Sequence, residues 1–267
     1  MQHDFIISVL DTDSITISKP DNSEFSKQEI DKLTEEINSQ SDEMIKWDFE
    51  FYIPKLIVVK SKNYIMDFGD GKIKYKGSSI RDQKKEPALR DLMNELVNEM
   101  LNNNDKNQLV NIYNKYIIEA CNVTDIRRWS AKKTITRAIL NCKGYTEKDI
   151  KDKKIRRNET TVWDAIVNED DIQEGNKIYL YPTIQVLDIV RKTLTNGRTK
   201  ETYKYFYGLK LDKYYDINNS DLDIEQLLKR CYNTVEIFDL ILDIKGLFLN
   251  YSLTKNKDKI NDLIGEI

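Results

Sequence analysis

The sequence of 267 residues contains few of the residues on which most catalytic and metal-binding motifs depend. It has one histidine, His3, and three widely separated cysteines, Cys121, Cys142 and Cys231. Ser-His-Asp or Cys-His catalysis would need His3, which lies at a terminus that we expect to be poorly ordered. The cysteine spacing fits neither a zinc site nor a disulfide framework, so we expect buried or incidental thiols in a reducing compartment.

Phosphate-binding glycine motifs and long apolar runs are also missing. The sequence has no GxxxxGK loop and no GxGxxG fingerprint, which excludes the commonest nucleotide-binding folds. No apolar run approaches the length of a membrane span, and no basic segment followed by an apolar one begins the chain. Charged residues make up 33% of the chain and aromatic residues 10%. This composition predicts a soluble globular protein of one large or two modest domains, by default cytoplasmic.

Near the start of the chain, two β-prone runs flank a short acidic stretch. Residues 6–10 and 15–18 are rich in branched side chains, and Asp11-Thr12-Asp13-Ser14 lies between them. The pattern predicts a β-hairpin that presents two carboxylates at its tip. A divalent cation would cancel the repulsion between these carboxylates, and Mg²⁺ prefers such hard oxygen ligands. The alternative is a plain turn, because Asp, Thr and Ser are ordinary turn residues.

Charge is unevenly distributed, although the formal net charge is only −3. Residues 21–50 are acid-rich, residues 55–90 are rich in Lys and Arg, and a second basic block covers residues 127–157. Two basic blocks in an otherwise acidic chain would attract a polyanion locally. A solvated face is the alternative for each block.

The first 90 residues have the periodicities of strands and helices. The predicted elements are a helix over 24–46, strand segments over 49–51 and 55–59 that continue through 62–66, a tight turn at Gly69-Asp70-Gly71, a strand over 72–76 and a helix beginning near Pro87.

Beyond residue 100 the apolar spacing predicts mostly helices. The predicted elements are helices over 109–117 and 227–242, a short strand over 175–181 stopped by Pro182, a turn at Thr195-Asn196-Gly197-Arg198 and a last helical turn or contact peptide around Ile260, Leu263 and Ile264.

Three short motifs occur in order within the first 90 residues. They are Asp11-Thr12-Asp13-Ser14, then Lys62-Asn63-Tyr64, then Lys76-Gly77 followed by Arg81-Asp82. In this order and spacing they resemble motif C, the Lys-x-Tyr motif and the Lys-Gly and Arg pattern of family B DNA polymerases. These motifs lie in the second half of the palm in that family. Three matches in the right order are far more specific than any one of them.

The resemblance has departures. Val9-Leu10 stands where the family usually has Tyr-Gly before motif C. Beyond Arg90 the likeness is weaker, although residues 125–133 and 175–180 look like thumb segments of viral and phage relatives. The family's exonuclease, fingers and first palm motif should precede motif C, whereas Met1 stands about ten residues before it. We therefore hypothesise the C-terminal subunit of a split polymerase, with a piece of a longer polymerase as the alternative.

The resemblance implies an α+β fold, with residues 1–90 as the C-terminal half of a palm and residues 91–267 as a mainly helical thumb. The palm half would be an antiparallel sheet with packed helices, left with open strand edges that another chain covers. Asp13 would be a direct ligand in a two-Mg²⁺ site for nucleotidyl transfer, and Asp11 would support it. The second bridging Asp would come from another polypeptide, so the chain alone would be inactive.

The resemblance also implies primer-template DNA, dNTPs and an N-terminal polymerase chain as partners. The family's DNA contacts carry over to Lys62 and Tyr64, and with less support to Lys76 and Arg81. The basic block would grip the duplex backbone through residues that include Arg127, Arg128, Lys132 and Lys133. The competing hypothesis is a non-catalytic DNA-binding remnant or helical interaction module in which the acidic tetrad is only a turn.

Overall fold

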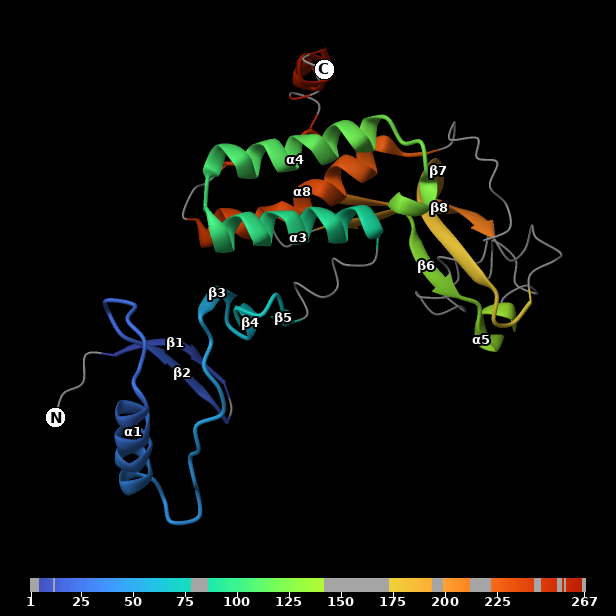
Figure 1. The fold of residues 1–267 in the computed structure, drawn as a ribbon. Helices are drawn as coiled ribbons and strands as arrows, with labels where there is room; N and C mark the ends of the chain where they lie inside the picture. The colour runs from blue at the N-terminus through green and yellow to red at the C-terminus, as the bar shows by residue number, and fades with distance from the viewer. Residues whose placement is uncertain are drawn as a thin grey trace. The chain divides into compact units, whose positions relative to one another are not determined.

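The computed structural model describes residues 5–11, 13–77, 86–141, 173–193, 199–211, 222–242, 246–253, 256 and 258–265. The chain divides into two compact units, of which the first contains residues 1–82 with 240–242 and the second residues 83–239 with 243–267 (Figure 1). Both units combine helices with antiparallel sheets, so the expected α+β class is confirmed. The assignment of residues 1–90 to a palm and 91–267 to a thumb stays a prediction.

The predicted hairpin opens the first unit. Strands β1 (Ile6–Leu10) and β2 (Ile15–Ser18) pair antiparallel, and the register shifts between Ile7 and Val9. The backbone N–H of Asp11 donates to the Ser14 carbonyl at 2.9 Å and closes the turn. The tetrad therefore stands at a hairpin tip, as its sequence predicts.

Helix α1 (Lys27–Gln40) is shorter than the predicted range of 24–46. It begins at a capping box, in which Ser26 and Glu29 satisfy each other's backbone N–H groups. It ends early because the side chain of Asp42 accepts a hydrogen bond from the backbone two residues further on, at 2.9 Å. Such local bonds favour turns over a continued helix.

A three-stranded antiparallel sheet follows in the order β3 (Lys55–Lys60), β4 (Asn63–Asp67) and β5 (Ile73–Lys76). The prediction that residues 62–66 continue the preceding strand is wrong, because the chain reverses at Lys62, whose φ is 59°. Residues 49–51, predicted as strand, lie in none. The tight turn before β5 is confirmed, and Gly69 and Gly71 take φ angles of 77° and 78° that favour glycine.

The core of the first unit is small and joins its two sheets. Val9 of β1 packs with Tyr64 and Met66 of β4, and the half-buried Leu56 and Phe68 border this cluster.

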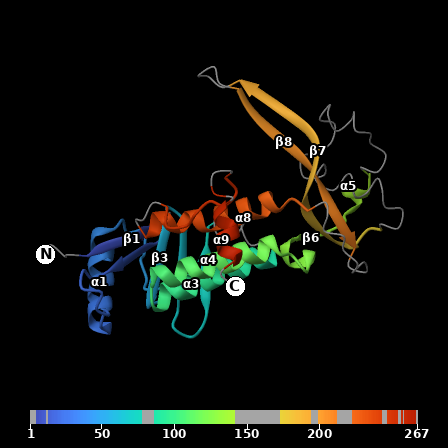
Figure 2. The ribbon, with the colours of Figure 1, turned by 90° about the horizontal axis from the view of Figure 1, so that it is seen from above.

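The second unit is built on three helices that lie side by side, α3 (Pro87–Asn102), α4 (Lys106–Cys121) and α8 (Ile224–Ile241) (Figure 2). The predicted apolar stripes face the core, and the buried members include Leu92, Leu96, Leu109, Tyr113, Tyr116, Leu227, Val235 and Phe238. Cys231 is also buried, and burial raises the pKa of its thiol, which makes it unreactive packing. Cys142 lies outside the described residues. None of the described helices is long and apolar enough to span a membrane.

The second unit also contains a sheet, in the order β6 (Ala131–Thr134), β7 (Lys177–Thr193) and β8 (Thr199–Leu211). The prediction that Pro182 stops a short strand is wrong, because β7 continues through it. Strand β6 pairs with β7 only as far as Leu180, so Pro182 lies where no ladder bond to β6 is needed. The register against β8 shifts just beyond Pro182, as at a bulge. The unit is thus less helical than expected.

Three shorter helices complete the described part of the second unit. They are η2 (Ile126–Trp129), α5 (Arg137–Leu140) and α9 (Asp258–Gly265). Helix α9 contains the predicted C-terminal helical turn around Ile260, Leu263 and Ile264. The predicted turn at Thr195-Asn196-Gly197-Arg198 lies outside the described residues.

Candidate functional site

The acidic tip of the β1–β2 hairpin presents its two carboxylates differently. The side chain of Asp11 is 23% exposed, whereas Asp13 is exposed at the turn. Thr12, between them, lies outside the described residues. Asp13 is therefore the carboxylate that a ligand from solvent reaches more readily.

The second motif, Lys62-Asn63-Tyr64, lies next to Asp11 of the first motif. Lys62 lies at the β3–β4 turn, and its Nζ is 3.4 Å from Oδ1 of Asp11. The Lys62 side chain is 65% exposed, so solvent screens this ion pair and its contribution to stability is small. The pair nevertheless brings together two predicted site residues that are about fifty positions apart in the sequence.

Tyr64 and Lys76 lie beside each other on β4 and β5, where they are register partners. The Lys76 ammonium stands 5.5 Å from the centre of the Tyr64 ring. Hydrogen bonding to Tyr64 raises the pKa of Lys76, and the charges of Asp11 and Glu50 act in the same direction. The structure thus gathers Asp11, Lys62, Tyr64 and Lys76 in one part of the first unit.

Two residues that belong to the matched motifs, but to which the sequence assigned no role, hold the Lys62 turn in place. Asn63 is 7% exposed, and its Nδ2 donates to the Ser61 carbonyl at 2.9 Å. Gly77, with a φ of 103°, lies against this turn, and a Cβ on it would come within 2.1 Å of Asn63 Oδ1 and 2.6 Å of the Lys62 carbonyl oxygen. Only glycine fits there. The signal available in the sequence was the glycine directly after Lys76.

The basic residues predicted in the second unit fall into two groups. The guanidinium of Arg128 is 2.6 Å from Asp91 and also pairs with Glu119, and these carboxylates raise the pKa of Arg128. Arg127 donates to both oxygens of Asp125, at 2.9 and 3.0 Å. Both arginines therefore have carboxylate partners within the chain.

The two lysines of β6 lie differently. Lys132 is exposed, donates to the Tyr179 hydroxyl at 3.2 Å and stands 5.1 Å from the centre of that ring. Lys133 is half-buried and lies opposite Ile178. Arg81 and residues 142–157 of the basic block lie outside the described residues.

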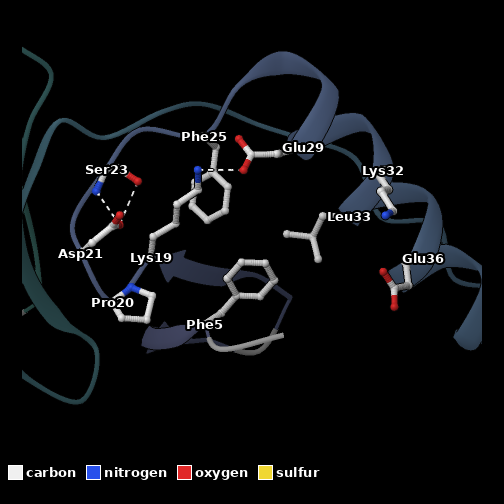
Figure 3. Close-up of a pocket in the computed structure, with 10 residues that line it drawn as sticks. All are labelled: Phe5, Lys19, Pro20, Asp21, Ser23, Phe25, Glu29, Lys32, Leu33 and Glu36. Carbon is white, nitrogen blue, oxygen red and sulfur yellow. Dashed lines mark hydrogen bonds and ion pairs between the residues drawn. The ribbon is translucent and has the colours of Figure 1, made fainter. Parts of the chain in front are cut away.

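A separate hollow of about 580 Å³ lies between the start of β1 and α1, and none of the predicted site residues line it (Figure 3). Phe5, Phe25 and Leu33 give it an apolar lining. Lys19 and Glu29 point toward each other across Phe25, with Nζ and Oε1 2.8 Å apart. Bonds from Lys19 first, and then from Ser26, lower the pKa of Glu29 to about 2. Because these charges already satisfy each other, the hollow offers little to a charged ligand.

The sequence predicts Asp11 and Asp13 as the metal ligands of the first unit. Within the part of the chain that the structure describes, no group of three or more His, Cys, Asp and Glu side chains could hold a metal ion. Two carboxylates at a turn suit Mg²⁺, which typically takes one or two carboxylates plus phosphate oxygens and water. The donor set fits part of such a site.

No protein-family model matches the chain, and no curated protein is similar enough in sequence to be matched.

Proposed function

We propose that this chain supplies the motif C half of the palm and the thumb of a family B DNA polymerase. The observation that carries the proposal is the ion pair between Asp11 and Lys62, at 3.4 Å. Together with Tyr64 and Lys76, these residues represent three separate motifs of the resemblance in one place. If the resemblance is correct, residues of all three motifs should lie close together. A plain turn between two strands would not need them to.

The carboxylates have distinct roles in the proposal. Asp13, exposed at the tip, is the direct Mg²⁺ ligand, and Asp11 supports the site while its charge is shared with Lys62. Bound Mg²⁺ would neutralise charge on the triphosphate and orient it toward the primer 3′-OH. A pair of metal ions about 4 Å apart needs carboxylates on more than one side. Residues outside this sequence supply the second bridging carboxylate, together with the fingers and exonuclease.

The basic residues bind the primer-template duplex. Lys62 and Lys76 are placed to meet phosphate or groove acceptors next to the carboxylates, with Tyr64 packing beneath Lys76. In the second unit the guanidiniums of Arg127 and Arg128 are engaged by carboxylates, so we expect the exposed Lys132 to contribute more to contact with the duplex backbone. A role for Arg81 rests on the resemblance alone.

The ion pair also favours the second candidate, a non-catalytic interaction module. In such a module Lys62 offsets the charge of Asp11, and the hairpin needs no metal. The two candidates differ in whether the chain takes part in chemistry.

The test is complementation. The purified chain is mixed with a polymerase chain that carries the exonuclease, fingers and first palm motif, and extension of a primed template is measured with Mg²⁺ and dNTPs. We expect extension in the mixture and none with either chain alone. Extension by this chain alone would refute the proposal that its metal site is incomplete. If the two chains form a stable complex but the mixture is inactive, the non-catalytic module is favoured.

A further inference from the structure

Residues 42–52, which connect α1 to β3, are rich in both acidic and large apolar side chains. Their carboxylates are those of Asp42, Glu43, Asp48 and Glu50, against the single ammonium of Lys46. Their apolar side chains are those of Met44, Ile45, Trp47, Phe49, Phe51 and Tyr52. We call this stretch the acidic aromatic segment.

Most of the apolar side chains of the acidic aromatic segment face solvent. Met44 is 93% exposed, Ile45 55% and Phe49 53%, and Phe51 and Tyr52 are 39% and 40% exposed. An aromatic side chain offers on the order of 200 Å² for burial, so a partner that covered these exposed side chains would bury a substantial apolar area. Areas of that kind on soluble proteins are typically covered by a partner.

The backbone of the segment is held in place despite its lack of helix or strand. The side-chain amide of Asn38 on α1 both donates to the Trp47 carbonyl and accepts from the Trp47 N–H, each at 2.7 Å. At the far end the Phe51 ring packs edge-on against Phe68, with ring centres 5.4 Å apart. An exposed apolar surface on a fixed backbone loses little conformational freedom when a partner binds.

Charge selects the kind of partner. The segment carries four carboxylates, and the one ammonium, Lys46, lies 3.6 Å from Asp48. This negative surface repels nucleic acid and anionic lipid, whereas it attracts a protein surface with Lys and Arg beside apolar residues.

We propose that the acidic aromatic segment is a docking surface for a stretch of another protein in which Lys or Arg side chains alternate with large apolar ones. The apolar side chains supply the buried contact, and the carboxylates speed encounter and set specificity. This inference goes beyond the polymerase proposal and does not depend on it.

The probe for this proposal is a fluorescent synthetic peptide of alternating Lys and Leu, with an all-Lys peptide of equal charge as comparison. Binding to the full chain is followed by anisotropy. The Met44→Ser/Ile45→Ser/Phe49→Ser variant keeps every carboxylate, and we expect it to weaken binding of the Lys-Leu peptide at least tenfold. We expect the all-Lys peptide to bind more weakly than the Lys-Leu peptide and to respond little to this variant.

A pair of charge variants separates docking from bulk attraction. The first variant, Glu43→Gln/Asp48→Asn/Glu50→Gln, removes three negative charges from the acidic aromatic segment. The second, Glu24→Gln/Asp31→Asn/Glu35→Gln, removes three exposed negative charges outside the segment, one just before α1 and two on α1. We expect the first to weaken binding severalfold, most at low salt, and the second to leave it nearly unchanged. Equal losses in both would overturn the proposal.

Circular dichroism confirms that each variant is folded. An apolar variant that binds the Lys-Leu peptide as tightly as the unmodified chain would also overturn the proposal. Self-association of the chain that the apolar variant abolishes would overturn it as well, because the occupant would then be a second copy.

Discussion

The two units of this chain bury their apolar residues to very different extents. In the described part of the first unit the buried apolar residues are Val9, Val59, Tyr64, Ile65 and Met66, and exposed Ile and Phe residues lie on or beside its strands. In the second unit the apolar faces of three helices are buried against one another. The second unit has the more extensive buried core, whereas the first leaves a larger share of its large apolar side chains exposed, as the proposal of a covering partner expects.

The β1–β2 sheet of the first unit shows the same exposure of apolar side chains. The β1–β2 sheet has two strands and a β1 surface on which Ile7 and Leu10 are 63% and 65% exposed. A two-stranded ribbon is marginal by itself, and an exposed apolar one tends to pair with other chains. The comparison teaches that the candidate site lies on the less self-sufficient unit, which accords with a site completed from elsewhere.

The largest effect on stability is expected in the second unit. Leu96 on α3 is fully buried, and Leu96→Ala should lower the free energy of unfolding by about 2–5 kcal/mol because it leaves a cavity. Leu10→Ala, at an exposed position of the first unit, should change it by less than about 0.5 kcal/mol. Denaturant titration measures both. Equal losses would break the contrast between the units.

Arg128→Ala tests whether a predicted DNA contact is instead structural. It leaves Asp91 and Glu119 without their shared partner and should cost about 1–3 kcal/mol of stability, since the group is only partly exposed. Lys132→Ala should cost less than about 0.5 kcal/mol and mainly weaken DNA binding at low salt. Thermal melts and filter binding separate the two. A stable Arg128→Ala chain that has lost DNA affinity would reverse the assignment.

Gly77→Ala tests the support under the site in the first unit. The new Cβ collides with Asn63 and the Lys62 carbonyl at a φ of 103°, at a cost of about 1–3 kcal/mol. Because the turn that carries Lys62 moves, primer-template affinity should fall, and we expect Lys62→Ala to lower it as well. Gly71→Ala is the matched control, since its Cβ would meet nothing within 4 Å although its φ is also positive. DNA affinity retained in Gly77→Ala would show that the turn does not position Lys62.

The smallest effect concerns acid stability of the first unit. The folded-state pKa of Glu29, about 2, lies below its ordinary value of 4.5. The ionised carboxylate therefore stabilises the fold above about pH 4.5, and this contribution is lost as the pH falls toward 2. Because Glu29 is exposed, Glu29→Gln should flatten the stability profile only slightly over that interval. A profile unaltered by Glu29→Gln would mean that the ion pair with Lys19 does not form in solution.

Local chemistry explains what the sequence predicted. Alternating branched residues around Asp11 and Asp13 define the hairpin, and Gly69 and Gly71 define the next turn, because each needs only neighbouring residues. The turn at Lys62 was missed because neither glycine nor asparagine occupies the positive-φ position. It is held instead by Asn63, against Gly77, which directly follows strand β5.

Contacts between distant residues account for the other differences. The pairing of Arg128 with Asp91 joins positions 37 residues apart, which no sequence period encodes. Strand β7 passes through Pro182 because β8, from further along the chain, supplies its ladder. Likewise, the spacing of the acidic aromatic segment does not indicate that the Asn38 side chain fixes its backbone.

The most direct test of the proposed site compares two aspartates in the complemented polymerase. Asp13 and Asp70 are both carboxylates at hairpin turns of the first unit, and only Asp13 lies in the acidic tetrad. Initial rates of primer extension are measured at saturating Mg²⁺ for Asp13→Ala and Asp70→Ala. The proposal predicts a loss of at least about 100-fold for Asp13→Ala and a rate near that of the unmodified chain for Asp70→Ala. Full activity in Asp13→Ala would contradict it.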